Sequence, residues 1–564
     1  MSANLTALDP QQRAAAQCVS GPVVIHAGAG TGKTRTITHR LAHAIASGIV
    51  EASQTLTVTF TNRAAGELRS RLVELGIPNA QVRTFHSAAL RQLRFFYPQV
   101  FTNQLPTLIS SKFKFVQDAA ARCHINADPD TVRDLASEIE WAKVNIISPD
   151  MYRETALTSG RIVGHSLTAE QVAQVYETYL KVLDEAQCMD FEDVLLTTVA
   201  LLSNYPELAA QVRSQYRYFT VDEFQDVSPV QFELLCLWLG NRDDVCVVGD
   251  PAQTIYEFTG ATPEYLATFA KYFPRATNFE LTQSYRSTEQ IVEIANKVLL
   301  RDNSNALRLK ATRGSGPDVG VQAYGDDEAE AAGIATKIGK LIESGLSPRD
   351  IAIIYRINSQ SEAYETALAN AGIPVTIRGA SRFFERVEIK NALLHLRANL
   401  QTADERELNF IVRDIVSGLG WAPAAPSAGR AAQETWESMN TLVHLADDFA
   451  QQHPQSLLPE FIAVLDHRNE YDHDPVANAV TLASIHAVKG LEWDAVFVAG
   501  LSEGLLPISY AKTPTLVNQE RRLFYVALTR AKTHLELSWA KARHGQGRAH
   551  RSPSLFLNEL EKSN

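Results

Sequence analysis

The sequence predicts an α/β protein with two lobes, each built on a parallel sheet and each carrying a mainly helical insertion. Short runs of β-branched and aromatic residues alternate with longer helical stretches, a pattern typical of parallel sheets covered by helices. The strand-like runs form two groups along the chain, and mostly helical stretches separate them. At about 150 residues per compact unit, the 564 residues suffice for two lobes and two insertions.

Eight apolar runs are the expected strands, four in each lobe. The first lobe contains the runs Val23–Ile25, Leu56–Phe60, Tyr218–Val221 and Val245–Val248. The second lobe contains the runs Ile351–Ile354, Leu482–Ile485, Ala495–Val498 and His534–Ser538. We expect the first lobe over 1–105 and 195–285, its insertion over 106–194, the second lobe over 286–378 and 475–564, and its insertion over 379–474.

Composition excludes several classes of protein. The chain is 45% hydrophobic and 21% charged, which is ordinary for a globular protein and excludes wholesale disorder. No apolar run approaches the ~20 residues needed to cross a bilayer, so no membrane partner is expected. The five cysteines are scattered without a C-x-x-C pair, which indicates a reducing, cytoplasmic location. A net charge of −11 argues against a uniformly basic nucleic-acid coat protein but leaves room for a local basic groove.

A glycine-rich loop follows the first expected strand. The segment 26–34 reads His-Ala-Gly-Ala-Gly-Thr-Gly-Lys-Thr, and its glycines let backbone N–H groups face the phosphates of a nucleotide. Lys33 would reach the β- and γ-phosphates, and Thr34 would bind Mg²⁺. The strict motif has glycine where this chain has Ala27. An ordinary glycine-rich turn is the alternative, but the strand before the loop and the helix after it favour ATP binding.

An acidic segment follows the strand Tyr218–Val221. It reads Asp-Glu-Phe-Gln-Asp over 222–226. A carboxylate at the carboxyl end of a strand suits the metal ion of a nucleotide, so Asp222 is a candidate Mg²⁺ ligand. Glu223 could orient and deprotonate the attacking water. Alone, this segment would be interpreted as a solvated acidic turn. Together with the glycine-rich loop, it indicates nucleotide hydrolysis.

Nine further segments occur in an order that is typical of one enzyme family. They are Leu8–Gln12, Thr59–Asn62, Thr84–Ser87, Val247–Tyr256, Gln283–Ser287, Tyr355–Asn358, Phe383–Arg386, His486–Glu492 and Arg521–Lys532. With these motifs the chain resembles superfamily 1 DNA helicases of the UvrD/PcrA/Rep family over nearly its whole length. The resemblance implies two RecA-like P-loop lobes and an ATP-driven motor.

The resemblance also implies an ATP site shared by the two lobes. Its catalytic residues would be Lys33, Glu223, Gln253, Arg286 and Arg530. Its nucleotide contacts would be Gln12, Ala27, Gly28, Gly30, Thr31, Gly32, Lys33, Thr34, Arg35, Tyr285, Arg286, Glu492 and Arg530, with Thr34 and Asp222 on Mg²⁺. In this scheme Gln12 reads adenine, Tyr285 stacks on it, and Glu492 holds the ribose. Arginines that contact the phosphates from the second lobe would make hydrolysis depend on lobe closure. A surface ion pair is the alternative for each arginine alone.

Single-stranded DNA is the partner that the resemblance implies. Phe60, Tyr256 and Phe258 match the positions on which the family stacks bases, and stacking tolerates any base sequence. The matching polar neighbours are Asn62, His86, Arg356, Asn358 and His486. Core packing is the alternative for any one aromatic residue.

Two features depart from the family pattern. Phe258 is followed by Thr259 where the family usually has arginine, and Ser284 replaces a usual asparagine. The run Gly249–Tyr256, with Thr259 soon after it, resembles the actinobacterial UvrD-like branch. The insertion 379–474 looks shorter than the duplex-contacting domain of the family.

The sequence therefore predicts an ATP-dependent helicase that moves 3′ to 5′ on single-stranded and tailed duplex DNA. DNA repair or replication-fork maintenance is the expected setting, with a repair or loading partner as a further expectation. The alternative is an ATP-driven translocase or displacement protein that does not unwind without a partner. A third, weaker interpretation is an unrelated P-loop kinase, which would not be stimulated by DNA.

Overall fold

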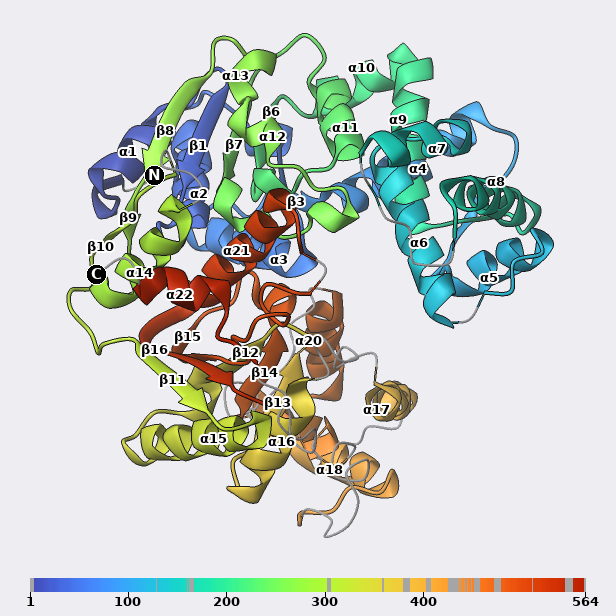
Figure 1. The fold of residues 1–564 in the computed structure, drawn as a ribbon. Coiled ribbons are helices and arrows are strands. Elements are labelled where there is room, and N and C mark those ends of the chain that lie inside the picture. Colours follow the sequence, from blue (N-terminus) through green and yellow to red (C-terminus); the bar gives the residue numbers. More distant parts are fainter. Residues whose placement is uncertain are drawn as a thin grey trace. The chain divides into compact units, whose positions relative to one another are not determined.

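The structure is a computed structural model in which two compact units are distinguished (Figure 1). It describes residues 5–127, 129–159, 161, 167–301, 306–357, 360–378, 386–401, 407–424, 457–470, 478–509, 511–542 and 551–561, together with parts of 436–450. Unit 1 comprises Met1–Arg286 and Asn303–Arg313, and unit 2 comprises Ser287–Asp302 and Gly314–Asn564. No described helix is long and apolar enough to cross a membrane.

Unit 1 is built on a six-stranded parallel sheet (Figure 1). In spatial order its strands are β3 (Gln81–Thr84), β2 (Thr55–Thr59), β6 (Tyr218–Val221), β7 (Val245–Gly249), β1 (Val23–Ala27) and β8 (Thr277–Leu281). The four strands expected here are confirmed, whereas β3 and β8 were not expected. Both lie at edges of the sheet, and β8 has a single buried residue, so neither forms an apolar run.

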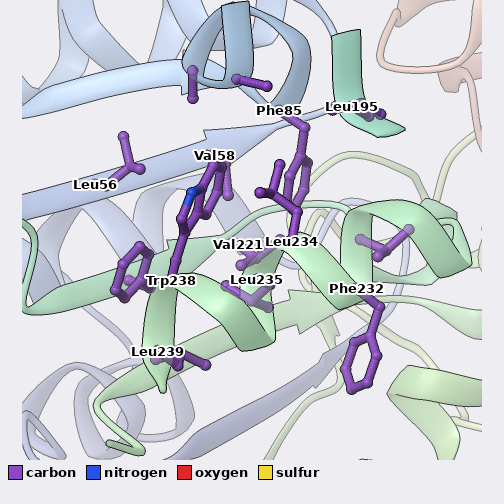
Figure 2. Close-up of a cluster of buried hydrophobic side chains, with 14 of the residues drawn as sticks. Leu56, Val58, Phe85, Leu195, Val221, Phe232, Leu234, Leu235, Trp238 and Leu239 are labelled. Carbon is purple, nitrogen blue, oxygen red and sulfur yellow. The ribbon is translucent and has the colours of Figure 1, made fainter. Parts of the chain in front are cut away.

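Helices cover this sheet, and two apolar clusters fix them to it. The helices of one cluster are α1 (Pro10–Gln17), α2 (Lys33–Ala46) and α3 (Asn62–Glu74), and those of the larger cluster are α4 (Phe85–Val100), α9 (Phe191–Asn204), α10 (Pro206–Gln215) and α11 (Pro229–Leu239). Figure 2 shows part of the larger cluster around Trp238, whose ring stacks on Phe85 at 5.8 Å and whose Nε1 donates to Gln92 Oε1 at 2.9 Å. Leu56 and Val58 from β2 and Val221 from β6 lie in the same cluster. Close packing here holds the ends of β2 and β6 in place.

A helical segment between β3 and β6 has a core of its own. Its helices are α5 (Phe113–Arg122), α6 (Pro129–Val144), α7 (Pro149–Thr158) and α8 (Ala169–Glu185). Two short parallel strands, β4 (Thr107–Leu108) and β5 (Cys188–Met189), pair with each other where the chain enters and leaves this segment. Lys143, at the end of α6, is fully buried and bonds to Asp190 Oδ2 at 2.7 Å and to Asp193 Oδ1 at 2.8 Å. This ion cluster joins α6 to the start of α9.

Unit 2 is built on a second six-stranded parallel sheet. In spatial order its strands are β11 (Gly320–Tyr324), β16 (Ala531–Ala540), β15 (Trp493–Val498), β12 (Ile351–Tyr355), β14 (Val480–Ser484) and β13 (Val375–Arg378). The four expected strands are confirmed, and the two unexpected ones, β11 and β13, are again the edge strands. The α/β architecture with two parallel sheets is therefore as predicted.

The helices of unit 2 fall into two groups. Around the sheet lie α14 (Glu289–Leu300), α15 (Asp327–Glu343), α16 (Ser361–Asn370), α21 (Pro514–Leu528) and α22 (Leu555–Glu561). A separate apolar cluster is formed by residues of α17 (Val387–Ala398), α18 (Leu408–Gly418) and α20 (Leu458–Glu470) together with neighbouring segments. α21 is the best buried of the sheet helices. Of its nine residues from Glu520 to Leu528, only Arg522 is not buried.

Candidate active site

The glycine-rich loop joins β1 to α2 in a conformation that only glycine adopts easily. Gly30 and Gly32 have φ angles of +73° and +79°. A Cβ on Gly30 would lie 2.7 Å from Ser284 Oγ, and a Cβ on Gly32 would lie 2.6 Å from Gln12 Nε2. No side chain caps the start of α2, so its first N–H groups are available to an anion. This is the geometry of a phosphate-binding loop.

Side chains of the loop hold it in this shape. Lys33 Nζ donates to Ala27 O at 3.3 Å, which folds the ammonium group back over the loop. Thr31 Oγ1 donates to Gly28 O at 2.8 Å. Lys33 thus lies beside the backbone of the glycine-rich loop.

The predicted base contacts gather beside the same loop. Gln12 is buried on α1, and its Nε2 donates to Thr31 O at 2.9 Å. Tyr285 N donates to Gly30 O at 2.9 Å, and the Tyr285 hydroxyl donates to Asp9 Oδ2 at 2.6 Å. Arg35 Nη2 donates to Ala7 O at 2.9 Å. Arg286, expected in the second lobe, is instead the last residue of the first segment of unit 1 and lies next to Gly30.

Two carboxylates lie at the carboxyl end of β6. Asp222 is buried, its N–H donates to Val58 O at 2.9 Å, and its Oδ1 accepts from Glu223 N at 3.0 Å. Burial, and secondly the charge of Glu223, raises the pKa of Asp222 to about 7, although Lys33 opposes this shift. A divalent cation would stabilise the charged carboxylate. The oxygen donors of Asp222 and Thr34 are of the kind that Mg²⁺ prefers, so these residues fit that ion.

A chain of buried polar contacts leads away from Glu223. Gln225 Nε2 donates to Glu223 Oε2, and Gln225 Oε1 accepts from Asp250 N at 3.0 Å. Asp250 Oδ2 in turn accepts from Gln253 Nε2 at 2.7 Å. A Cβ on Gly249 would lie 2.4 Å from Gln225 Oε1, so the glycine makes room for this contact. Gln225 and Asp250 were not predicted as site residues, although both lie inside motifs that the sequence displays.

The aromatic residues predicted to stack on DNA lie together. The rings of Phe60 and Tyr256 are stacked, with their centroids 5.3 Å apart and an interplanar angle of 16°. The ring centroid of Phe258 lies 6.3 Å from that of Tyr256. Phe60 and Phe258 are 40% and 52% exposed, so core packing is the wrong interpretation for these two. Asn62 is exposed at the start of α3, two residues after Phe60. The cluster is an exposed aromatic surface at one end of the sheet.

A second aromatic contact at the surface of unit 1 involves His86. Phe191, at the start of α9, is 51% exposed, and its ring stacks on that of His86 at 4.0 Å. Burial lowers the pKa of His86 to about 4, so its imidazole is neutral at physiological pH. No motif pointed to Phe191, because the contact joins residues more than a hundred positions apart.

Unit 2 contains the remaining predicted residues. Arg356, expected to contact DNA, forms a bidentate ion pair with Glu520 in this structure. Burial, and secondly the charge of Arg356, lowers the pKa of His486 to about 4. Arg530 is buried, with its Nη1 donating to Leu491 O at 3.1 Å, and Glu492 pairs with Lys532 at 3.1 Å. Asn358 lies outside the described residues.

Comparisons with known proteins place these motifs in a family. Residues 8–274 match the model of the UvrD/REP helicase N-terminal domain, and residues 279–425 and 424–542 match that of the UvrD-like helicase C-terminal domain. The "ATP-dependent DNA helicase UvrD2" of Mycobacterium tuberculosis is 48% identical over 99% of this chain and 82% of the relative. The "ATP-dependent DNA helicase PcrA" of Bacillus subtilis is 29% identical over 99% of this chain and 86% of the relative.

These matches cover both units and nearly every described element. They include the phosphate loop of unit 1 and the α21 segment of unit 2. The resemblance predicted from the motifs is thereby confirmed. The chain is an enzyme of the UvrD/REP helicase family.

Proposed function

We propose that this chain is an ATP-dependent DNA helicase that moves 3′ to 5′ along single-stranded DNA and unwinds duplexes in DNA repair or replication-fork maintenance. The main support is a chain of hydrogen bonds in unit 1 that ends three residues before the exposed aromatic cluster. Glu223, beside the phosphate loop, is connected through Gln225 and Asp250 to Gln253. Three residues further on, Tyr256 stacks on Phe60 in the exposed aromatic cluster. A change at the nucleotide thus has a short route to a surface suited to bases. The names of the mycobacterial and bacillary relatives describe ATP-dependent DNA helicases, which supports the coarser part of the proposal.

In this proposal Lys33 and Arg530 neutralise charge on the γ-phosphate, and Gln253 detects its presence. Asp222 and Thr34 hold Mg²⁺, and Glu223 orients the attacking water. Phosphoryl transfer requires little more than such positioning and charge neutralisation. Gln12, Arg35 and Tyr285 bind the base end of the nucleotide, and Glu492 binds its ribose.

On the DNA side, we assign base stacking to Phe60, Tyr256 and Phe258. We add Phe191 because its exposed ring stacks on that of His86, which we assign to the same path. The polar contacts assigned to this path are Asn62, His86, Arg356, Asn358 and His486. We also propose the four-part division into two lobes, 1–105 with 195–285 and 286–378 with 475–564, and two insertions, 106–194 and 379–474. Arg286 and Asn303–Arg313 depart from these bounds, because they belong to unit 1. Separate apolar clusters around α5–α8 and around α17, α18 and α20 support the two insertions.

Substituting Phe60 by alanine is expected to weaken binding of single-stranded DNA. Losing one stacked base costs about 1–3 kcal/mol, which corresponds to a 5- to 150-fold higher Kd. Fluorescence anisotropy with a labelled oligothymidine measures this change. Phe113 is a matched control, since it is 49% exposed on α5 and outside the aromatic cluster. Equal Kd values for Phe60→Ala, Phe113→Ala and the unsubstituted protein would contradict the assignment.

Binding of Mg²⁺ is expected to strengthen as pH rises from 6 to 8. Because the pKa of Asp222 is raised to about 7, a proton occupies this carboxylate below pH 7 and must leave before the metal binds. With one competing proton, the apparent Kd of Mg²⁺ should rise about tenfold per pH unit below pH 7. Titration of ATP hydrolysis with Mg²⁺ at pH 6, 7 and 8, corrected for protonation of ATP itself, measures it. A Mg²⁺ Kd that does not change with pH would show that Asp222 is not the metal ligand.

A second candidate function is translocation or protein displacement without unwinding. Thr259 favours it, because a threonine there removes a cation from the expected DNA path. Displacement of streptavidin from biotinylated oligonucleotides tests translocation separately from unwinding. A 3′-to-5′ motor should clear a 5′-terminal biotin faster than a 3′-terminal one. Equal rates at the two ends would contradict the proposed polarity.

A further inference from the structure

A buried ion pair in unit 2 joins Arg356 to Glu520 on α21, the helix that ends two residues before Arg530. Glu520 is on α21, and its carboxylate accepts from Arg356 Nε at 3.0 Å and from Arg356 Nη2 at 2.8 Å. Glu520 Oε2 also accepts from the backbone N–H of Ile508 at 3.2 Å. The side chains of Arg356 and Glu520 are only 12% and 7% exposed. A bidentate pair that excludes most water fixes both the position and the orientation of the guanidinium group.

The segment around Arg356 is fixed in a second way. Gln360 Oε1 accepts from the backbone N–H groups of Arg356 and Ile357 at 3.0 and 2.9 Å. His486 is close enough for the charge of Arg356 to contribute to its lowered pKa. Arg356 is therefore held by Glu520 and lies close to His486, a second residue that we assign to the DNA path.

The other end of α21 leads to the ATP-site arginine. Leu523 through Leu528 are all buried, so this part of the helix is packed on every side. Arg530 follows two residues after the helix ends, with its Nε donating to Val526 O at 3.0 Å. At 1.5 Å per residue, the ten positions from Glu520 to Arg530 span about 15 Å. A packed helix of this length moves as a rigid element, so a displacement at Glu520 reaches Arg530.

We propose that Glu520 is a positioning residue that couples DNA binding at Arg356 to the ATP site at Arg530. A DNA phosphate that reaches Arg356 competes with Glu520 for the same guanidinium charge. The resulting change in the ion pair shifts α21 and, with it, Arg530. The inference rests on the proposed function, since it requires that Arg356 contacts DNA and that Arg530 contacts ATP. It adds a residue to which no role in either site has been assigned above.

The test is the ratio of ATP turnover with saturating single-stranded DNA to turnover without DNA. In Glu520→Gln the side chain keeps its size but loses its charge, so we expect this ratio to fall about fivefold or more. Glu559→Gln is the matched control, because Glu559 forms a bidentate pair with Arg521, the next residue on α21. In the control the ratio should stay within about twofold of the unsubstituted protein. A general loss of helix stability would lower both ratios, whereas coupling lowers only the first.

A second substitution keeps the inference testable if Glu520→Gln folds poorly. Arg356→Lys retains the positive charge but loses the bidentate geometry, so the stimulation ratio should fall here too. In the double variant the loss should not exceed that of the larger single loss, because both changes break one pair. Full stimulation in either single variant, or additive losses in the double variant, would overturn the inference. Absence of DNA stimulation in the unsubstituted protein would instead overturn the proposed function, and this inference with it.

Discussion

Substituting Glu223 by glutamine is expected to lower kcat for ATP hydrolysis by about 10²–10⁴-fold while ATP still binds. Glutamine has nearly the same size as glutamate but cannot accept a proton from the attacking water. The residue has a left-handed backbone conformation, with φ +51° and ψ 43°, which directs its side chain away from the path of a regular strand or helix. Gln225 Nε2 donates a hydrogen bond to the Glu223 carboxylate and so restricts its position.

Steady-state ATP hydrolysis with saturating single-stranded DNA measures this loss, and binding of a fluorescent ATP analogue measures affinity. Glu233→Gln is the matched control, because Glu233 is exposed on α11 of the same unit. We expect full activity in the control and an unchanged analogue Kd in both variants. A Glu223→Gln protein that retained more than about a tenth of the normal kcat would show that another group activates the water.

Substituting Lys33 by alanine is expected to reduce ATP hydrolysis by about 10²–10³-fold and, in contrast to Glu223→Gln, to weaken nucleotide binding. The ammonium group already lies over the loop through its contact with Ala27 O. Its loss removes a positive charge both from the bound phosphates and from the transition state. Asp222 would also lose the neighbouring cation that lowers its pKa.

The same two assays separate the effects of these substitutions. Lys271→Ala, an exposed lysine on α13 (Phe269–Tyr272) of unit 1, controls for loss of charge. Lys33→Ala should increase the Kd of the ATP analogue, whereas Lys271→Ala should leave both kcat and Kd unchanged. An unchanged Kd in Lys33→Ala would contradict the assignment of this loop as the phosphate site.

The fold could be predicted from the sequence wherever a strand is buried on both faces. All eight expected strands are present, because central strands of a parallel sheet are apolar along their length. Four strands of the two six-stranded sheets were not predicted from the sequence. They are β3, β8, β11 and β13, and all four are edge strands. An edge strand is covered on fewer sides, so polar residues interrupt its apolar pattern, as the exposed Thr277 and Asn278 do in β8.

The candidate site was predictable where its residues are close in sequence. The phosphate loop and the acidic segment after β6 each carry their chemistry within nine residues or fewer. Gln225, Phe191 and Glu520 escaped detection because each acts through a partner far away in the sequence. Motif spacing also gave no sign that Arg356 is bound in an ion pair. Such contacts depend on the tertiary fold and leave no local pattern.

Strand displacement on 3′-tailed and 5′-tailed duplexes, with ATP hydrolysis followed in the same reaction, tests the proposed function most directly. The Lys33→Ala protein serves as the control without ATP hydrolysis. We predict displacement from the 3′-tailed duplex alone, and its loss in Lys33→Ala. DNA-stimulated hydrolysis without displacement would contradict unwinding by the isolated chain and favour the translocase. Displacement from the 5′-tailed duplex alone would contradict the proposed direction of movement.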